Sequence, residues 1–362
     1  MIVQTYFPQR LSPLRYDAYL ASGWFRGSIM LYKMDLLCLE RDIFSVVNIR
    51  LKITEFEFKK KQRKLMRNND ARFRTTIRKA DPGPEQEKLY QKQKARFKGF
   101  IHETLHDHLF QGHPYTPFDT YEINVYDGDR LIASSLFDLG QKSVASLIGI
   151  QDPDYAKYSL GTYTMLKEIE YARTLQMRWY YPGYVLDKPS SFSYKLRLGD
   201  FQYYNHNKRW VSIDKFVRNQ SLAEQFKKKL ARMEDCLRHY FVEYDAWLYP
   251  YFSMGYMSYW SVQFVRSARF LEIPTGNNNR LIITYNLEDQ EYQLLWASSS
   301  ASQDQLITME LSEEFKNDPK YLLDLLEIES IIHTSTEPAT IAKKVIEITS
   351  KTGTSNPRNH LR

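Results

Sequence analysis

The sequence predicts a mixed α/β fold, because the middle of the chain carries hairpin, strand, helix and strand signals in that order. Asp127-Gly128-Asp129 is a strong β-hairpin signal, and strand-like segments flank it. A strand followed by a helix and another strand implies a parallel pair with a right-handed crossover. The predicted strands cover residues 121–126, 130–138, 143–150 and 179–184, and the predicted helix follows Ser159.

The first hundred residues predict a small mixed region. The expected elements are a helix over 16–20, a turn over 23–27, and strands over 29–32 and 46–58. The longer strand alternates its apolar side chains with a period near two. Chain breakers at 81–84 then precede a predicted helix over 85–110. Its apolar face is formed by Tyr90, Phe97, Ile101 and Leu105.

Positive charge is concentrated in one segment of the chain. Ten basic residues lie between Lys59 and Lys79, and Asp70 is the only acid among them, so this segment carries +9. Since the whole chain carries +7, the remainder is close to neutral at about −2. Such a local concentration is typical of a docking surface for a polyanion. A solvated helix face or a mobile basic loop is the structural alternative.

Residues 152–195 predict a strand end, a helix and a broken strand. Ser159 stands at an N-cap position, where its hydroxyl can accept a backbone N–H of the first turn. Apolar residues then recur at helical spacing, with Glu168 among the interleaved polar positions. Pro182-Gly183 interrupts the aromatic strand, where a central strand ordinarily excludes proline. Broken pairing opens a gap in a sheet, and strand ends of this kind are the usual ligand site in α/β folds.

The last 150 residues carry weaker signals. The expected elements are a long helix over 212–244, a hairpin over 281–296, two helices within 321–348 and a frayed tail over 351–362. We therefore predict three parts. These are an N-terminal domain over 1–84 with the basic segment, a second domain over 85–210, and a helical or mixed extension over 211–362.

Composition excludes several classes of protein. No run of about 18 uncharged apolar residues occurs, so no transmembrane helix is expected. The N-terminus lacks a charged segment followed by an apolar one, so no secretory signal is expected. Cys38 and Cys236 are the only cysteines, which excludes a disulfide scaffold and a Cys-rich metal cluster. A cytoplasmic protein without a membrane partner is therefore predicted.

The helix and the aromatic strand after it resemble the arginyl-tRNA–protein transferase family, including its bacterial leucyl branch. The matching motifs are Asp152-Pro153-Asp154-Tyr155, Ser159-Leu160-Gly161, Glu168-Ile169, Ala172, Tyr180-Tyr181-Pro182-Gly183-Tyr184 and Tyr194-Lys195. Weaker matches upstream are Gly23-Trp24-x-Arg26, Tyr32, Arg50, Phe56, Gln62-Arg63-Lys64, Arg67-Asn68 and the hairpin leading to Asp138. The similarity covers residues 10–205 approximately.

The resemblance implies an acyltransferase fold of the acetyltransferase (GNAT) type, as a duplicated or two-lobed unit with a C-terminal extension. It implies an arginyltransferase, or a leucyltransferase, that moves the amino acid from a charged tRNA to the N-terminal amine of a protein. Acceptors beginning with Asp or Glu are expected, and the product carries a destabilising N-terminus for protein degradation. The implied partners are aminoacyl-tRNA and these acceptors, with no cofactor and no metal.

Six residues are predicted to form the site. The N–H groups around Ser159 and Gly161 would bind a phosphate or the developing oxyanion. Tyr181 and Tyr184 would line the gap, Asp138 would receive the amine proton, and Lys195 would pair with the acidic acceptor side chain. The structural alternatives are a simple N-cap, buried core aromatics and a surface Asp. Phosphates of the tRNA would be bound by Arg63, Lys64, Arg67 and Asn68.

Three competing functions remain open. His102-Glu103-Thr104-Leu105-His106 matches the helical H-E-x-x-H zinc motif of peptidases, without an identifiable third ligand. A non-catalytic relative that binds tRNA or acidic N-termini is a second alternative. Cys38 is the only cysteine where the family usually has a Cys-x-x-Cys-like cluster, and residues 187–191 lack the family's later cysteine. An enzyme using acyl-CoA is a third, although the usual Gly-rich loop before the helix is absent.

Overall fold

The computed structural model describes residues 2–257, 262–276, 279–307 and 309–351. Its internal contacts divide the chain into two compact units. One unit contains residues 1–4, 35–45 and 218–362, and we call it the C-terminal unit. The other contains residues 5–34 and 46–217, and we call it the central unit. The predicted mixed α/β class is confirmed, since each unit combines a sheet with helices.

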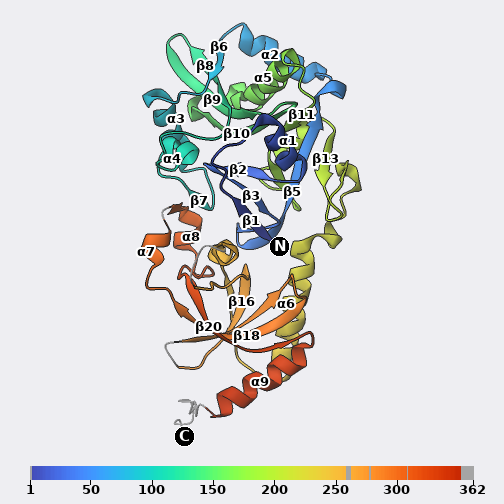
Figure 1. Ribbon diagram of the computed structural model, residues 1–362, viewed down its shortest axis with the longest axis vertical. Coiled ribbons are helices and arrows are strands. Elements are labelled where there is room, and N and C mark those ends of the chain that lie inside the picture. Colours follow the sequence, from blue (N-terminus) through green and yellow to red (C-terminus); the bar gives the residue numbers. More distant parts are fainter. Residues whose placement is uncertain (1, 258–261, 277–278, 308, 352–362) are drawn as a thin grey trace. The chain divides into compact units, whose positions relative to one another are not determined.

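A long mixed sheet forms the frame of the central unit (Figure 1). Its strand order is β14-β13-β5-β11-β10-β9-β8-β6, and β12 also pairs with β5. The strands are β5 (Asp42–Lys52), β6 (Arg74–Lys79), β8 (Thr120–Asp127), β9 (Arg130–Leu139), β10 (Ser143–Gln151), β11 (Trp179–Tyr181), β12 (Tyr184–Leu186), β13 (Phe201–Tyr204) and β14 (Trp210–Ser212). Strands β10 and β11 are parallel, and the neighbouring pairs β9–β10 and β5–β11 are antiparallel.

The predicted hairpin and the predicted parallel pair are both confirmed. Strands β8 and β9 pair in antiparallel fashion down to Asp127 opposite Arg130. Gly128 in the turn has a φ of 60°, which glycine adopts without strain. Strand β10 leads through helix α5 (Leu160–Thr174) to β11, and β10 and β11 are parallel.

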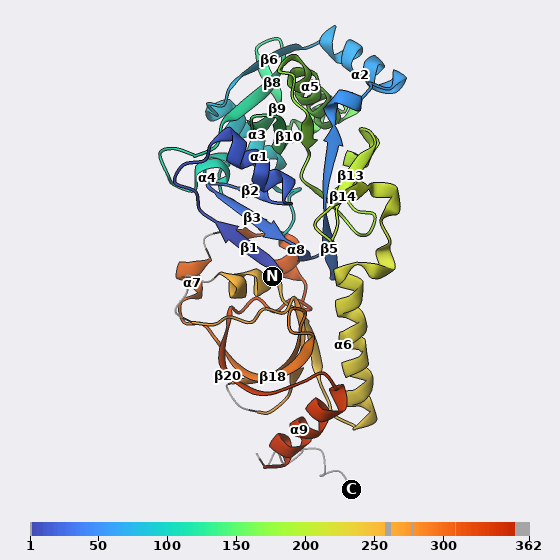
Figure 2. The same cartoon turned by 45° about the vertical axis from the view of Figure 1, so that its right-hand side comes forward.

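Helices cover both faces of this sheet. Helix α5 packs with α2 (Lys60–Asp70) on one face, and Figures 1 and 2 show these two helices side by side. On the other face lie α1 (Pro13–Ala21), α3 (Pro84–Lys94) and α4 (Leu105–Phe110). Successive side chains of a strand point to opposite faces of the sheet, and β9 shows this. Leu136 belongs to the core below α3 and α4, whereas Phe137 belongs to the core below α5.

Several predicted boundaries in this unit are wrong. The helix expected over 85–110 is two helices, because α3 ends at Lys94 and α4 begins only at Leu105. Gly99 with a φ of 82° and the N-cap Thr104, whose hydroxyl accepts the N–H of Asp107 at 2.9 Å, separate them. The short strand β7 (Phe100–Ile101) lies in this interval.

Two further predictions for the first hundred residues change in detail. The predicted turn over 23–27 contains strand β2 (Phe25–Gly27), which pairs with β3 (Met30–Met34). The strand predicted over 46–58 is the latter part of β5, and a 3₁₀ turn at Ile53–Glu55 ends it. The expected helix over 16–20 is confirmed as part of α1.

An antiparallel sheet with strand order β15-β16-β17-β18-β20 forms the C-terminal unit. Figure 2 shows this sheet strongly curved. Its strands are β15 (Asp245–Leu248), β16 (Arg269–Ile273), β17 (Arg280–Asn286), β18 (Glu291–Ser299) and β20 (Leu326–Ser335). The other elements that involve this unit are α6 (Leu222–His239), α7 (Gln303–Leu306), α8 (Glu313–Asn317), α9 (Pro338–Lys351), β1 (Val3–Tyr6), β4 (Leu36–Leu39) and β19 (Glu310–Leu311).

The C-terminal predictions have mixed outcomes. The hairpin over 281–296 is confirmed as β17 and β18, paired down to Asn286 opposite Glu291. The first of the two helices expected within 321–348 is wrong, because Leu326–Ser335 pairs as an edge strand with β18. The helix expected over 212–244 begins only at Leu222, where Ser221 caps it. The tail beyond 351 lies outside the described residues, among which no helix has the length and apolar character that a bilayer span requires.

Candidate active site

The parallel pair β10–β11 separates after three residue pairs, and this separation creates the predicted gap in the sheet. The pairs are Ser143 with Trp179, Val144 with Tyr180 and Ala145 with Tyr181. Beyond them, Pro182 has no N–H to donate, and the Gly183 carbonyl instead accepts from the N–H of Ile49 at 3.1 Å. The chain then pairs as β12 with β5, whereas β10 continues along β9.

A buried carboxylate lies on the α5 side of this gap. Glu168 of α5 is fully buried, and its carboxylate accepts hydrogen bonds from three hydroxyls. The Tyr180 hydroxyl donates at 2.6 Å and the Ser146 hydroxyl at 3.3 Å, and the Ser135 hydroxyl donates as well. Burial raises the pKa of Glu168 to about 7, although these hydrogen bonds favour the charged form and oppose the shift.

A half-buried amine lies next to this carboxylate. Nζ of Lys195 donates to the Tyr184 carbonyl at 3.2 Å and lies 5.5 Å from the ring centres of Tyr184 and Phe192. Burial lowers the pKa of Lys195 to about 8, and the charge of Glu168 opposes that shift. Gly183 has a φ of 86°, and a Cβ atom at that position would lie 3.4 Å from Nζ of Lys195.

Glu168 and Lys195 therefore both change protonation close to neutral pH. An acid and a base with pKa values displaced toward each other are typical of sites that move protons. Both side chains lie where β11 breaks at Pro182. The arrangement is suited to a reaction in which an amine loses a proton.

The two predicted tyrosines lie on the other face of the sheet, toward α1. Tyr181 is 4% exposed, and its ring meets that of Trp210 edge to face at 5.7 Å. Tyr184 is half-buried between Phe25, at 5.4 Å, and Phe192, at 5.2 Å. Burial raises the pKa of Tyr184 to about 12. Both residues flank the Pro182-Gly183 interruption, and each ring packs against other aromatic rings.

Ser159 does not cap helix α5 with its side chain, contrary to the sequence prediction. It adopts a left-handed conformation, with φ 52° and ψ 45°, and its hydroxyl makes no capping hydrogen bond. Gln151 supplies the cap instead, since its Oε1 accepts the N–H of Gly161 at 2.8 Å. The Thr162 N–H donates to the Ser159 carbonyl at 3.1 Å. These N–H groups already have partners, so the predicted oxyanion role would require Gln151 to move.

Asp138 is buried rather than a surface residue at a strand end. Its carboxylate accepts from Nη1 of Arg26 at 2.6 Å, from the Thr120 hydroxyl at 2.7 Å and from the Tyr16 hydroxyl at 3.0 Å. Arg26 also donates to the carbonyls of Ser28, at 2.7 Å, and Leu109, at 3.0 Å. This network connects β9 to β2 and α4, so Asp138 stabilises the packing of these elements independently of any contact with a substrate.

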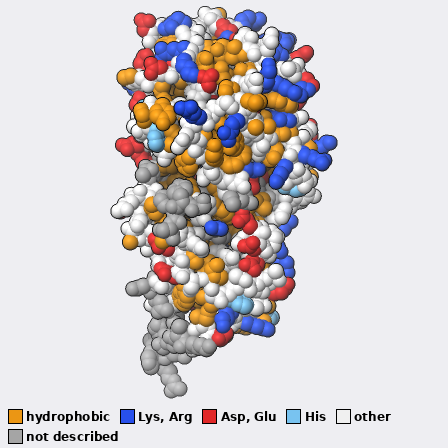
Figure 3. Space-filling model, in the orientation of Figure 1, with side chains coloured by type: hydrophobic (Ala, Val, Ile, Leu, Met, Phe, Trp, Pro, Cys, Tyr) orange, Lys and Arg blue, Asp and Glu red, His pale blue; other side chains and the backbone are white. Residues whose placement is uncertain are grey.

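The four predicted tRNA-binding residues lie together on the exposed side of α2. Arg63, Lys64, Arg67 and Asn68 are all exposed, whereas Met66 and Asn69 of the same helix are buried. Figure 3 shows basic side chains interspersed with hydrophobic ones over the upper part of the face drawn. Close to α2 in sequence, Arg72 lies 4.9 Å from the Tyr158 ring and Arg74 lies 4.2 Å from the Tyr126 ring.

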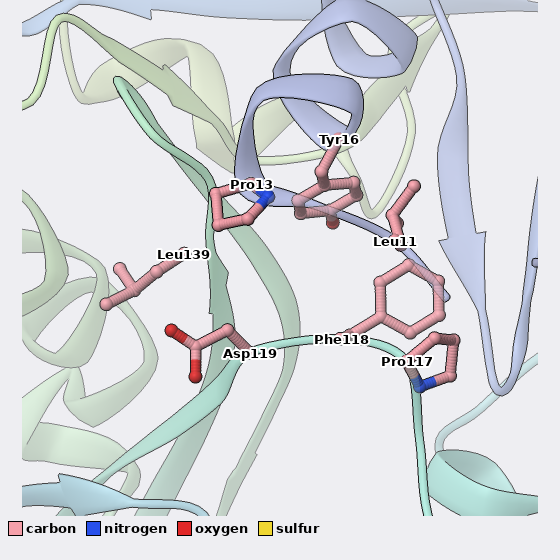
Figure 4. A pocket seen from close by; sticks show the side chains of 7 residues that line it. All are labelled: Leu11, Pro13, Tyr16, Pro117, Phe118, Asp119 and Leu139. Atoms are coloured by element: carbon pink, nitrogen blue, oxygen red, sulfur yellow. The ribbon is translucent and has the colours of Figure 1, made fainter. Parts of the chain in front are cut away.

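A separate pocket of about 190 Å³ opens beside α1 (Figure 4). Its walls come from α1 and the segment before it, and from the residues that precede β8 and end β9. The lining residues are Leu11, Pro13, Tyr16, Pro117, Phe118, Asp119 and Leu139. None of the predicted site residues lines it. Tyr16 links it to Asp138 through its hydroxyl.

The zinc motif does not have the geometry that it requires. Helix α4 begins at Leu105, so His102 precedes the helix and does not share a face with His106. The His102 ring packs edge to face on His108, whereas His106 packs on Phe110. Within the described ranges, no three His, Cys, Asp or Glu side chains are grouped so that they could hold a metal ion. Cys38 is buried, and burial raises the pKa of its thiol.

Sequence reasoning missed four members of the cluster at the gap. Glu168 was expected on the polar side of α5, and Ser135, Ser146 and Tyr180 were assigned no role. The available signal was the position of Glu168, which lies three residues after Met165 and four before Ala172, on the buried face. A carboxylate on the apolar face of a helix is unusual unless it is paired or functional.

Part of the chain is similar to known proteins. Residues 72–205 match the family model described as arginine-tRNA-protein transferase, C terminus. An aspartate/glutamate leucyltransferase of Leptospira interrogans is 24% identical in an alignment of 237 positions that covers 60% of this chain and 90% of that protein. One of Vibrio cholerae is 24% identical in an alignment of 216 positions that covers 56% of this chain and 85% of that protein.

Solved structures are only distantly similar. FemX is 12% identical with a TM-score of 0.31, over 49% of this chain and 61% of that one. The C-terminal domain of a putative lysylphosphatidylglycerol synthetase from Agrobacterium fabrum is 10% identical with a TM-score of 0.31, over 39% and 47%. TM-scores this low assign no fold. The family match, in contrast, encloses β10, α5, β11 and Lys195, so residues 72–205 of this chain are similar to the C-terminal part of arginine-tRNA-protein transferases.

Proposed function

We propose that this protein transfers an amino acid, leucine or arginine, from a charged tRNA to the N-terminal amine of proteins that begin with Asp or Glu. The observation that carries the proposal is that the family match encloses the gap between β10 and β12 together with Glu168 and Lys195. The names of the two bacterial relatives favour leucine as the donor and acidic residues as acceptors. The product would carry a destabilising N-terminus for protein degradation.

The proposed fold is an acyltransferase fold of the acetyltransferase type, in a duplicated or two-lobed arrangement. Its support is a parallel pair of strands that separates after Ala145 and Tyr181, with a helix connecting the two strands. A gap of this kind admits an extended substrate between two strands without breaking an existing hydrogen-bond ladder. With this fold we also propose the three parts predicted from the sequence, which are two domains over 1–84 and 85–210 and an extension over 211–362.

The reaction joins an ester to an amine. The acceptor nitrogen attacks the ester carbonyl carbon, a C–N bond forms, and the C–O bond to the tRNA ribose breaks. The nitrogen loses one proton, and the leaving ribose oxygen gains one. An aminoacyl ester is already activated, so positioning and proton transfer can carry the rate without a covalent enzyme intermediate.

Glu168 and Lys195 are the groups that we assign to this chemistry. Glu168, linked to Tyr180 by a hydrogen bond of 2.6 Å, would accept the amine proton, which its pKa of about 7 permits at neutral pH. Lys195, as an ammonium, would hold the carboxylate of the acidic acceptor residue. Tyr181 and Tyr184 would orient the substrates along the gap. In place of the roles predicted from the sequence, we assign Asp138 to positioning Arg26, and Ser159 and Gly161 to the start of α5.

Binding of the tRNA body is assigned to α2. Arg63, Lys64 and Arg67 are exposed and carry three positive charges on one short helix, and Asn68 beside them can donate to a phosphate oxygen. The pairs Arg72–Tyr158 and Arg74–Tyr126 continue the basic surface with aromatic rings. Such contacts give binding that depends on salt and not on sequence.

A transfer assay tests the proposal directly. The purified protein is incubated with tRNA charged with labelled leucine or arginine, and with peptides that begin with Asp, Glu or Ala. We expect label on the Asp and Glu peptides from one of the two tRNAs, and none on peptides whose amine is acetylated. Absence of transfer from both tRNAs would contradict the proposal, and binding of either substrate without turnover would identify a non-catalytic relative.

A further inference from the structure

A stack of cations and aromatic rings occupies the sheet face opposite Glu168. The guanidinium of Arg50, on β5, lies 3.6 Å from the ring centre of Trp179 and 4.3 Å from that of Trp210. Its Nε donates to Oε1 of Gln202 at 2.9 Å, on the neighbouring strand β13. Three elements, β11, β5 and β14, therefore hold one guanidinium between two indoles.

Positive charge in this stack is not neutralised within the described part of the chain. Arg178 lies 5.3 Å from the Trp179 ring, and Lys33 lies 4.9 Å from the Tyr204 ring, which contacts Trp210 at 5.2 Å. Among the residues that the structure describes, no carboxylate forms an ion pair with Arg50, Arg178 or Lys33. Burial lowers the pKa of Arg50, and the charge of Arg178 lowers it further, whereas hydrogen bonding to Tyr181 opposes this. An anion would relieve this repulsion.

The stack is accessible and adjoins the gap. Arg178 is exposed, and Arg50, Trp179 and Trp210 are only half-buried. Tyr181, which ends the pairing of β10 with β11, bonds to Arg50. The stack therefore lies next to Tyr181, the residue at which β10 and β11 separate.

An unpartnered amide next to the stack also indicates a ligand. Asn48 lies two residues before Arg50 on β5, so both side chains point to the same face of the sheet. It is opposite Tyr184 and only 7% exposed, and its buried Nδ2 has no hydrogen-bond partner among the described atoms. A buried amide without a partner costs free energy, and a ligand oxygen at this place would satisfy it.

We infer that Arg50, Trp179, Trp210 and Arg178, with Asn48 beside them, bind the unpaired 3′ end of the aminoacyl-tRNA. This inference rests on the proposed function. The two guanidinium groups take backbone phosphates, and the indole rings offer flat apolar surface to a base, which is how proteins commonly bind single-stranded nucleic acid. A peptide carboxylate would pair with one Arg but would leave the exposed parts of the two half-buried indole rings uncovered. The aminoacyl ester at the 3′ terminus then enters the gap beside Tyr181.

Equilibrium binding to two RNAs tests the inference without requiring transfer. One is an uncharged tRNA, and the other is the same tRNA with its unpaired 3′ nucleotides removed, at one salt concentration. The wild-type protein should bind the intact tRNA about 10-fold more tightly, since stacking of one base on an aromatic ring contributes about 1–3 kcal/mol. The variants R50M and R178Q should bind the intact and the shortened tRNA with nearly equal affinity. Arg178 is exposed, so R178Q gives an answer even where R50M fails to fold.

The variant R63A on α2 is the matched control. It removes a charge from the proposed tRNA-body surface, so it should weaken both RNAs alike and leave their ratio unchanged. Equal weakening of both RNAs by R50M and R178Q, or no effect of either, would overturn the inference. Selective loss of affinity for an Asp-initial peptide would assign the stack to the acceptor and would also overturn it. Failure of the transfer assay with the RNA ratio intact would instead contradict the proposed function alone.

Discussion

Lys195 links the candidate chemistry to a measurable pH dependence. Its pKa is lowered from 10.5 to about 8, so its ammonium is complete well below pH 8 and is lost as the pH rises through 8. The acceptor amine must itself be neutral, and its ordinary pKa is about 8. We therefore expect transfer to an Asp-initial peptide to rise toward pH 8 and to fall above it.

Two substitutions at this position separate charge from shape. K195R stays charged at higher pH, so the falling limb should move upward by about one pH unit or more. K195M should lower kcat/KM for acidic acceptors about 10–100-fold at pH 7 and leave tRNA affinity unchanged. Arg197, exposed in the same 3₁₀ turn, provides the control R197M. A K195M enzyme with the wild-type pH profile would disprove the role of Lys195.

Glu168 should make the folded protein more stable in mild acid. Its pKa in the folded state, about 7, lies above the ordinary value of 4.5, so between these values the folded state binds more protons than the unfolded state. The contribution of this residue to stability therefore falls as the pH rises from about 4.5 to 7, and changes little above 7. From pH 5 to pH 8 we expect the wild type to lose about 2 kcal/mol more than E168Q. Urea unfolding of both proteins at the two pH values measures this difference, and parallel losses would place the pKa of Glu168 near its ordinary value.

At the scale of single elements, the start of α5 shows how a tertiary contact replaces a local one. Ser159 has the residue type of an N-cap but adopts a left-handed conformation. The side chain of Gln151, the last residue of β10, caps the helix instead. A cap of this kind depends on where β10 lies relative to α5. Sequence spacing along the helix does not contain that information.

Paired substitutions measure which residue is the cap. Q151A should destabilise the protein by about 1 kcal/mol, because the Gly161 N–H loses its acceptor. S159A should cost less than about 0.5 kcal/mol, and S159G should stabilise by about 0.5–1 kcal/mol because glycine adopts a φ of 52° without strain. Thermal or urea unfolding compares the three. A larger loss for S159A than for Q151A would restore Ser159 as the cap.

The helices and strands around the gap could be predicted from the sequence, but the cluster of side chains that they bring together could not. The β8–β9 hairpin, β10 and α5 follow from turn residues and periodicity, which are local properties of the chain. The cluster of Glu168, Tyr180 and Ser135 joins residues of three elements that only the sheet register brings together. The prediction of one helix over 85–110 was wrong because the apolar pattern continues on both sides of Gly99, where the backbone turns.

At the scale of the whole molecule, the +9 segment should make the proposed binding to RNA sensitive to salt. The affinity for a nucleic acid falls with log salt in proportion to the number of phosphates contacted, by about 0.9 per phosphate for a duplex. Replacing Arg63, Lys64 and Arg67 together by Ala should reduce this slope by about 2–3 and leave the unfolding midpoint unchanged, because all three side chains are exposed. The neutral neighbour provides the control, since N68A should leave the slope unchanged. An unchanged slope in the triple variant would remove α2 from the tRNA-binding surface.

The C-terminal unit is assembled from distant parts of the chain. The β4–β5 hairpin, residues 36–45, belongs to it and not to its own neighbours in sequence. The N–H of Arg41 donates to the Tyr321 hydroxyl at 2.7 Å, and the N–H of Ala223 donates to the Ser45 hydroxyl at 2.8 Å.

A shortened chain tests this assembly. A fragment ending at Val217 should aggregate, because Leu36, Ile43 and Phe44 lose the residues that bury them. A second fragment, in which a Gly-Ser linker also replaces residues 35–45, should recover solubility. Size-exclusion chromatography distinguishes the two. A monomeric first fragment would show that the hairpin does not depend on residues 218–362.

The sequence by itself predicted the family that residues 72–205 match, the mixed α/β class and the segment in which positive charge is concentrated. These properties reside in ordered motifs, in local periodicity and in the charge of a continuous segment, none of which requires knowledge of distant contacts. Only the tertiary structure decided which carboxylate lies at the gap, which residue caps α5 and which cations lack a carboxylate partner among the described residues. Burial and pairing belong to the positions of strands relative to one another, and the protonation of Glu168 and Lys195 follows from burial and not from residue type.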